Sequence, residues 1–209
     1  MSFVKICGLT RECDIDYVNK YRPDYIGFIF STTPNRFRRQ VSVKQAERLK
    51  KKLNDQIKVV GVFVNEPIEF IVDICNNNTV DVIQLHGEEN EDYIIGLKSF
   101  INKPIIKAIK VQSTEQIIKA ENLSCDYLLL DTYKKNSYGG TGEKFNWDII
   151  PKNMEKPFFL AGGLTAENVA LAISTVKPYC VDLSSSSETN GYKDELKIKR
   201  IIEEVRRIK

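Results

Sequence analysis

The stretch FVKICG (residues 3–8) is a short apolar run that holds one lysine and ends in a cysteine followed by a glycine. Runs of this length, rich in β-branched, aromatic and other apolar residues, predict β-strands. Seven further runs of the same kind follow: YIGFIF (25–30), VVGVFV (59–64), DVIQLHG (81–87), IIKAIKV (105–111), YLLLDT (127–132), FFLAGGL (158–164) and YCVDLSS (179–185). The intervals between them are long enough for a crossover helix, which predicts repeated strand–helix units.

The segments between these runs carry signals for helix starts. Ser42 is followed three residues later by Gln45, and Ser113 by Gln116, which predicts a capping box at each helix N-terminus. Thr165 is the expected N-cap of the helix after the seventh run. The last helix is expected to pack on the sheet through an apolar stripe at a spacing of roughly 3.6 residues, formed by Leu196, Ile198, Ile201, Ile202, Val205 and Ile208.

Eight strand–helix units in succession predict a single (β/α)8 TIM barrel over residues 1–209. An open doubly wound sheet is the alternative, although it more often has five or six strands. No linker, low-complexity tract or change in composition divides the chain.

The composition limits the kinds of function. The net charge of +3 is too small to indicate nucleic-acid binding. No apolar run approaches the ~20 residues that a transmembrane helix needs, and no signal-peptide pattern is present, so a cytoplasmic protein is expected. Five cysteines without a C-x-x-C pair indicate neither a disulfide framework nor a structural zinc site, and one histidine excludes a multi-histidine metal site.

In a barrel of this type the chemistry lies where strands end and βα loops begin. The polar or glycine residues expected at these ends are Cys7-Gly8, His86-Gly87, Asp131-Thr132, Gly162-Gly163 and Ser184-Ser185. The other four cysteines are expected to be inert, because Cys13 and Cys75 fall in helical patterns while Cys125 and Cys180 fall at strand starts. Cys7 is therefore the candidate functional thiol.

Alternation along the strands groups further polar residues. Residues two apart point the same way, so Lys5 shares a face with Cys7, and Asp182 shares one with Ser184, as Gln84 does with His86. Several of these side chains are expected to point into the barrel, because buried polar groups need partners. Inside the barrel the positive charges of Lys5 and Lys107 would offset the negative charges of Asp131 and Asp182, or these lysines would belong to a purely structural ion network.

Two neighbouring strand ends have the pattern of a phosphate site. LAGGLTAENV (160–169) places a glycine pair before a helix, where the backbone can approach an anion closely, and VDLSSSSE (181–188) supplies hydroxyl and backbone donors beside it. Of Arg36, Arg38 and Arg39 after the second strand, one is a candidate partner for a carboxylate. The glycine-rich stretch YGGTGEKFNW (138–147) is either a loop that closes over a ligand or a plain flexible connection.

Together these pieces resemble the phosphoribosylanthranilate isomerase family of tryptophan biosynthesis. The matching stretches come in order over nearly the whole chain: VKICGLT (4–10), GFIF (27–30) with Arg36 shortly after, VGVFVNE (60–66), VIQLHGEE (82–89), LLLDT (128–132), GGTGEKFNW (139–147), AGGLTAENV (161–169) and VDLSSSSE (181–188). The resemblance implies an Amadori rearrangement of an aminoaldose phosphate to an aminoketose phosphate, without a cofactor or metal, by a cytoplasmic monomer or homodimer whose partner is a small phosphosugar.

The resemblance also implies roles for individual residues. Asp131 would be the general acid that opens the ribose ring, and Cys7, as a thiolate favoured by Lys5, would be the general base. Gly8 would leave room for the substrate. The implied binding residues are Arg36 for the anthranilate carboxylate, Gly162, Gly163, Ser184 and Ser185 for the phosphate, and His86 and Asp182 for the sugar.

One stretch departs from the family pattern. The family usually reads Ser-Ser-Gly-Val-Glu after the eighth strand, and here Ser186 stands in place of the glycine. If that glycine needs a positive φ, Ser186 would be strained. Three rival readings remain: another phosphosugar barrel enzyme of tryptophan or histidine biosynthesis, which would not need the Cys7 thiol, a non-catalytic sensor of a phosphorylated ligand, or a thiol-regulated protein.

Overall fold

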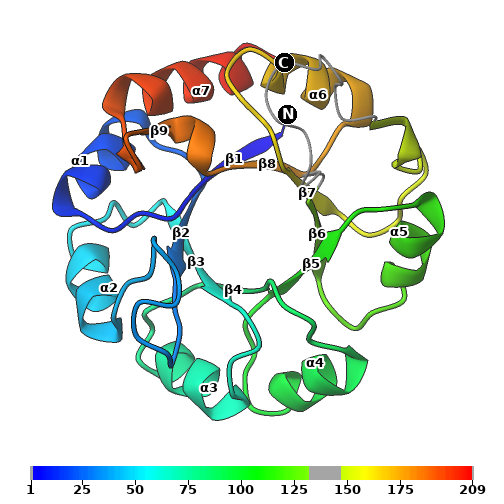
Figure 1. The fold of residues 1–209 in the computed structure, drawn as a ribbon, viewed down its shortest axis with the longest axis horizontal. Coiled ribbons are helices and arrows are strands. Elements are labelled where there is room, and N and C mark those ends of the chain that lie inside the picture. The colour runs from blue at the N-terminus through cyan, green and yellow to red at the C-terminus, as the bar shows by residue number, and fades with distance from the viewer. Residues whose placement is uncertain (1, 132–146, 209) are drawn as a thin grey trace.

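Eight parallel strands close into a barrel in which each strand pairs with the next along the chain and the last pairs with the first (Figure 1). The computed structural model describes residues 2–131 and 147–208. The strands are β1 (Phe3–Cys7), β2 (Tyr25–Ile29), β3 (Lys58–Phe63), β4 (Val82–Leu85), β5 (Ile105–Lys110), β6 (Tyr127–Asp131), β7 (Phe158–Ala161) and β8 (Cys180–Leu183). The predicted (β/α)8 barrel is confirmed, and the open sheet is excluded because β1 pairs with β8.

Helices surround the barrel on its outer side (Figure 1). They are α1 (Glu12–Tyr21), α2 (Val43–Lys50), α3 (Ile68–Asn76), α4 (Glu91–Lys98), α5 (Thr114–Ala120), α6 (Val169–Val176) and α7 (Glu195–Arg207). Between β6 and β7 the described residues form one 3-10 turn, η1 (Trp147–Ile149), where the repeat predicts a helix. No helix in the described ranges has the length and apolar character to cross a bilayer.

Two of the predicted helix caps are present, but the capping boxes are only half formed. The hydroxyl oxygens of Ser42 and Ser113 accept the N–H of Gln45 and Gln116 at 3.2 and 3.4 Å, respectively. The side chain of Gln45 donates to the Thr10 carbonyl at 2.6 Å and so does not return to its own cap. A tertiary contact has replaced the local hydrogen bond there, whereas Gln116 Oε1 accepts the Gln112 N–H at 3.0 Å, one residue before its cap.

The other two helix expectations need correction. Thr165 is not the N-cap of α6, which begins at Val169, but it caps the turn that leads into this helix: its Oγ1 accepts the Glu167 N–H at 3.2 Å, and its own N–H donates to Asn168 Oδ1 at 2.8 Å. In α7 the stripe is narrower than predicted: Ile198, Ile201, Ile202 and Val205 are buried, whereas Leu196 is 73% exposed. Leu196 lies in the first turn of α7.

Apolar side chains form two separate cores. The inner one fills the barrel and consists of Cys7, Val60, Val62, Val82, Ile106, Ala108, Leu129, Phe159, Ala161 and Cys180. The outer one lies between the strands and the helices and includes Ile6, Phe28, Phe63, Leu130, Val181 and Ile198. Successive strand residues alternate between the two cores, which is why the strands read as nearly continuous apolar runs.

Aspartates at the amino-terminal rim join neighbouring strands. Asp24, just before β2, accepts the Val4 N–H of β1 at 2.8 Å. Asp81 and Asp126, just before β4 and β6, accept the N–H groups of Val59 in β3 and Ile105 in β5 at 2.7 and 2.8 Å. Each carboxylate also meets a cation from a helix, Arg206, Lys50 or Lys98. These contacts satisfy N–H groups at the end of the barrel away from the expected site.

Replacing Asp24 with alanine is expected to lower the free energy of unfolding by about 1.5–3 kcal/mol, the usual cost of losing a hydrogen bond to a charged group. Urea denaturation measures the change. Because Asp24 lies at the opposite rim from the candidate site, kcat and KM should stay within a factor of about two. Asp73→Ala, on the exposed face of α3, is the matched control and should change stability by less than about 0.5 kcal/mol. Equal stability of the Asp24→Ala variant and the control would contradict the structural role.

Candidate active site

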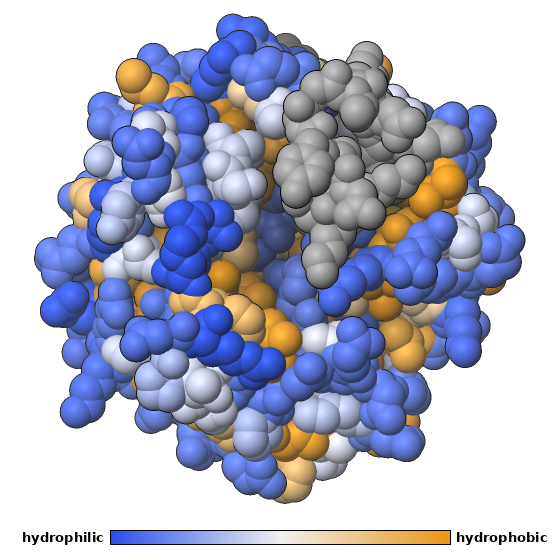
Figure 2. Space-filling model, viewed as in Figure 1, coloured by the Kyte–Doolittle hydropathy of each residue, from blue (hydrophilic) through white to orange (hydrophobic). Residues whose placement is uncertain are grey.

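A cavity of about 360 Å³ opens at the carboxyl ends of the strands. Figure 2 shows a hollow near the middle of the molecule, in line with the barrel axis of Figure 1. All the site residues predicted from the sequence except Arg36 line it: Cys7, His86, Asp131, Gly162, Gly163, Asp182, Ser184 and Ser185. The strand ends therefore bring together residues that are far apart in the chain.

The thiol of Cys7 lies in a space that neighbouring residues leave open. Cys7 is the last residue of β1 and is only 7% exposed. Its Sγ packs over Gly27 of β2, where an added Cβ would come within 2.6 Å of the sulfur. Any larger residue at position 27 would displace the thiol, because such an approach is closer than van der Waals contact.

A buried ion pair lies beneath the thiol. Lys5, two residues before Cys7, is fully buried, and its Nζ lies 2.8 Å from Asp182 Oδ2. Burial opposes the lysine charge, but Asp182 and Cys7 together raise the pKa of Lys5 above its usual value. Lys5 therefore remains a cation on the inner face of β1, as the alternation predicts, and it offsets Asp182.

The net effect on Cys7 is the reverse of the expected one. Burial raises the pKa of the Cys7 thiol, and Asp182 adds to the shift, whereas Lys5 and Lys193 act against it. Burial outweighs the two cations, so the pKa of Cys7 lies above its ordinary value. At neutral pH the unliganded protein carries Cys7 as the protonated thiol.

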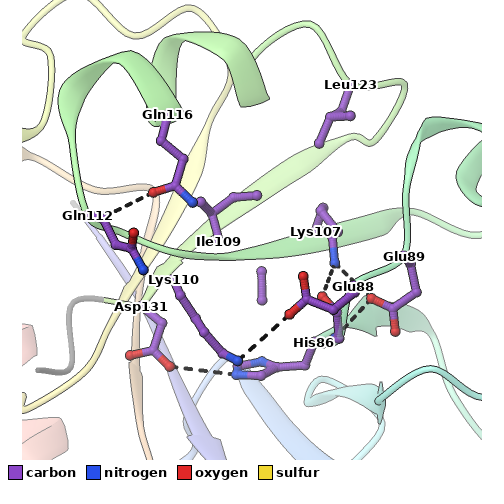
Figure 3. Close-up of a pocket in the computed structure, with 12 residues that line it drawn as sticks. His86, Glu88, Glu89, Lys107, Ile109, Lys110, Gln112, Gln116, Leu123 and Asp131 are labelled. Carbon is purple, nitrogen blue, oxygen red and sulfur yellow. Dashed lines mark hydrogen bonds and ion pairs between the residues drawn. The ribbon is translucent and has the colours of Figure 1, made fainter. Parts of the chain in front are cut away.

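Asp131 lies beside His86 at the edge of the cavity (Figure 3). His86 Nε2 lies 3.6 Å from Asp131 Oδ2. The Gln84 amide nitrogen lies 2.8 Å from His86 Nδ1, and because an amide NH₂ only donates, Nδ1 is the acceptor. The imidazole proton is then on Nε2 and points toward the carboxyl of Asp131.

Lys107 does not offset Asp131 as the sequence suggested. Its Nζ lies 2.7 Å from Glu89 Oε2 and donates to the Gly87 carbonyl at 2.6 Å (Figure 3). Both side chains of the Lys107–Glu89 pair are buried. Lys107 therefore stabilises the loop after β4, which carries His86. A second cavity of about 300 Å³ adjoins this loop and shares His86 and Asp131 with the first.

The glycine and serine loops line the side of the cavity next to β7 and β8. Gly162 and Gly163 both have positive φ, and an added Cβ at Gly163 would meet nothing within 4 Å, so the backbone there is open to the cavity. After β8, residues Ser185–Ser187 form a 3-10 turn, η2. Ser186 is not among the residues with positive φ, so the strain considered for this position does not occur.

The three arginines after β2 have separate environments. Arg36 donates to the Val64 carbonyl at 3.2 Å and to Glu66 at 3.3 Å, and it is not among the residues that line the cavity. Arg39 lines the cavity and binds Glu188 through Nε and Nη2 at 2.5 and 2.8 Å, and Arg38 binds the same carboxylate at 2.8 Å. The arginine at the cavity is therefore Arg39.

The role expected for Gly8 also changes. Gly8 has a φ of 84°, and an added Cβ would lie 2.5 Å from Cδ of Arg39. The space beside Gly8 therefore holds the Arg39 side chain rather than substrate. The glycine-rich stretch after β6 lies outside the described residues up to residue 146.

Two charged residues at the site were missed in the sequence. Glu188 and Lys193 face each other across a small antiparallel hairpin, β9 (Glu188–Thr189) and β10 (Tyr192–Lys193). Asn190 and Gly191 connect these strands with positive φ at both positions, and an Asn-Gly pair is the sequence signal for such a turn. Although burial opposes ionisation, Arg39 and Lys193 lower the pKa of Glu188 to about 2.

Comparison with known proteins gives one consistent result. The family model for N-(5'-phosphoribosyl)anthranilate (PRA) isomerase matches residues 4–204. The N-(5'-phosphoribosyl)anthranilate isomerase of Thermoanaerobacter pseudethanolicus is 47% identical over 99% of this chain and 98% of its own length. That of Lachnoclostridium phytofermentans is 46% identical over 95% of this chain and 94% of its own.

Solved structures agree with the sequence matches. Phosphoribosyl anthranilate isomerase from Thermotoga maritima superposes with a TM-score of 0.87 at 35% identity and covers 99% of both chains. A phosphoribosyl anthranilate isomerase in complex with reduced 1-(o-carboxyphenylamino)-1-deoxyribulose 5-phosphate gives a TM-score of 0.81 at 31% identity and covers 99% of both chains. Barrel, cavity and sequence agree: the chain belongs to the N-(5'-phosphoribosyl)anthranilate isomerase family.

Proposed function

We propose that this isomerase uses Cys7 and Asp131 to carry out the Amadori rearrangement of N-(5'-phosphoribosyl)anthranilate to 1-(2-carboxyphenylamino)-1-deoxyribulose 5-phosphate. The observation that supports it most directly is that both residues line one cavity, Cys7 from the end of β1 and Asp131 from the end of β6. A general acid and a general base must reach one small sugar, and strands on different sides of a barrel allow this.

In the proposed mechanism Asp131 gives a proton to the ribose ring oxygen, and the ring opens to a Schiff base. The Cys7 thiolate then removes the C2′ proton, which leaves an enol that tautomerises to the ketone. The His86 Nε2–H, which faces Asp131, would hold its carboxyl group in position. Lys5 and Lys193 favour the thiolate at the moment of proton transfer, because both act to lower the Cys7 pKa.

The rest of the cavity suits the remaining parts of the substrate. Gly162, Gly163, Ser184 and Ser185 would bind the phosphate, because exposed backbone next to glycines and serines offers hydrogen-bond donors to an anion. His86 and Asp182 would contact the sugar hydroxyls. For the anthranilate carboxylate we propose Arg39 in place of Arg36, because Arg39 lines the cavity and Arg36 does not.

The proposed setting follows from the chemistry of the chain. All five cysteines are free thiols, which suits a reducing compartment such as the cytoplasm. The reaction as written moves protons between groups that the chain supplies, so the proposal includes no cofactor or metal. A monomer or homodimer is proposed. The partner is the phosphosugar, and neither nucleic acid nor membrane has a part in it.

Removing either proton carrier is expected to stop the reaction without unfolding the protein. Cys7→Ala and Asp131→Asn should each lower kcat by about 10²–10⁴-fold, the usual contribution of a positioned acid or base. The assay follows loss of phosphoribosylanthranilate spectroscopically, and circular dichroism checks the fold. Turnover within a few-fold of the wild type in either variant would remove that residue from the mechanism.

The pH dependence should report the buried thiol. Because burial raises the pKa of Cys7, the active thiolate forms only as pH rises through a value above the ordinary ~8.5 of a cysteine. The acid limb of the kcat/KM profile is therefore expected to lie above that value. Alkylation of Cys7 by iodoacetamide, with Cys7→Ala as the blank for the other thiols, should rise over the same range. If the acid limb of the kcat/KM profile and the midpoint of alkylation both lay below pH 7, the conclusion that burial outweighs the nearby cations at Cys7 would be contradicted.

The assignment of the carboxylate partner is tested by a pair of variants. Arg39→Met should raise KM by about 10-fold or more, as expected for loss of a charge-assisted bond, whereas Arg36→Met should change KM less than about three-fold. The difference should vanish with a substrate analogue that lacks the ring carboxylate. The opposite pattern would restore Arg36 as the binding residue.

A further inference from the structure

Lys193 is a buried cation directly behind the loop that follows β8. Its residue surface is 4% exposed. Its Nζ donates to the Ser184 carbonyl at 2.9 Å, to Ser187 Oγ at 3.1 Å and to Glu188 Oε1 at 2.9 Å. Three hydrogen bonds satisfy all the donors of an ammonium group, so Lys193 itself has no donor left for a ligand.

The Ser184 carbonyl is the point at which Lys193 acts on the loop. It accepts from Lys193 and also from the N–H and the hydroxyl of Ser187, at 3.2 and 2.6 Å. In a trans peptide the following N–H points away from the carbonyl. The Ser185 N–H is therefore turned away from the side on which Lys193 lies.

The hydrogen-bond donors that remain without an acceptor in this loop lie at the cavity. Ser185 and Ser186 both line it. Within residues 2–131 and 147–208, the N–H groups of Ser185 and Ser186 donate to no acceptor, and the buried Ser186 hydroxyl has no partner. Buried polar groups are normally satisfied, so donors of this kind beside a cavity suit an anionic ligand.

The hairpin fixes Lys193 in this place. Lys193 and Glu188 are register partners in β10 and β9. Glu188 is in turn bound by Arg38 and Arg39, so one carboxylate joins the loop after β2 to the loop after β8. An added Cβ at Gly191 would lie 1.8 Å from Nη1 of Arg38, which shows how closely the two loops pack.

We propose that Lys193 is a positioning residue for the phosphate group of the substrate: it holds the Ser184 carbonyl so that the backbone N–H groups of Ser185 and Ser186 and the Ser186 hydroxyl meet the anion. This rests on the phosphate site in the proposed function. Lys193 does not touch the substrate, and its effect passes through the Ser184 peptide.

The test compares Lys193→Met with Lys197→Met. Lys197 binds the same loop at the Glu188 carbonyl, at 2.6 Å, but it is exposed, so this control removes the same charge without freeing the Ser184 carbonyl. Competitive inhibition by inorganic phosphate measures the anion site directly. In Lys193→Met the inhibition constant for phosphate and KM are expected to rise by about 10-fold or more. Because Lys193 also favours the Cys7 thiolate, kcat is expected to fall as well, so the inhibition constant, which does not depend on proton transfer, is the deciding measurement.

Ser187→Ala gives a milder version of the same change, because it removes one donor from the Ser184 carbonyl and one acceptor from Lys193. The inhibition constant for phosphate should rise by about two- to five-fold. This variant carries the test if Lys193→Met does not fold, as judged by circular dichroism.

The outcomes separate this inference from the proposed function. Failure of inorganic phosphate to compete with substrate in the wild type would remove the phosphate site itself. Competition in the wild type with the same inhibition constant in Lys193→Met and Ser187→Ala would overturn only the role of Lys193. An equal rise in Lys197→Met, or a fall in kcat at an unchanged inhibition constant, would also overturn it, because either pattern indicates a general charge effect or an action through Cys7.

Discussion

The pairing of β1 with β8 closes the barrel, and the site depends on what faces inward at that seam. Lys5 and Asp182 are register partners there, and their side chains form an ion pair inside the barrel. Two residues further along each strand, the same alternation places Cys7 and Ser184 at the cavity, where the Ser184 hydroxyl donates to the Cys7 carbonyl at 3.1 Å. A shift of this register by one residue would turn the two side chains of the shifted strand outward.

The charges around the cavity are divided between its two sides. Lys5, Lys193 and Arg39 lie near β1 and β8, where the thiol and the anion loops are. Asp131 and His86 come from β6 and β4, on the other side. A base that must be an anion before it acts benefits from nearby cations, whereas an acid must keep its proton until it acts, which is favoured when no cation stabilises its anion. The barrel keeps these two requirements apart on a rigid frame.

The sequence predicted the frame and most of the site because both depend on period-two alternation and on where strands end. The eight strands and the placement of Cys7, His86, Asp131 and Asp182 followed from those rules. Contacts between loops could not be predicted from these rules. The choice between Arg36 and Arg39 depends on the docking of one loop against Glu188, and the partner of Lys107 is Glu89, on a loop with no periodic pattern. The pKa of Cys7 required knowing how deeply the thiol is buried.

The aspartates of the amino-terminal rim join the strands of the barrel at three of its four odd–even pairs. Asp24, Asp81 and Asp126 each make two hydrogen bonds to the preceding strand: the backbone N–H donates to a carbonyl of that strand, and the carboxylate accepts an N–H from it. These bonds join β1 to β2, β3 to β4 and β5 to β6. Tyr179 stands at the equivalent position for β7–β8: its N–H donates to the Phe158 carbonyl at 2.9 Å, but its ring packs in tilted contacts on Phe3, Tyr127 and Phe159. Three strand pairs at this rim are therefore joined by a carboxylate, whereas the pair that carries the anion loops has aromatic packing at the corresponding place.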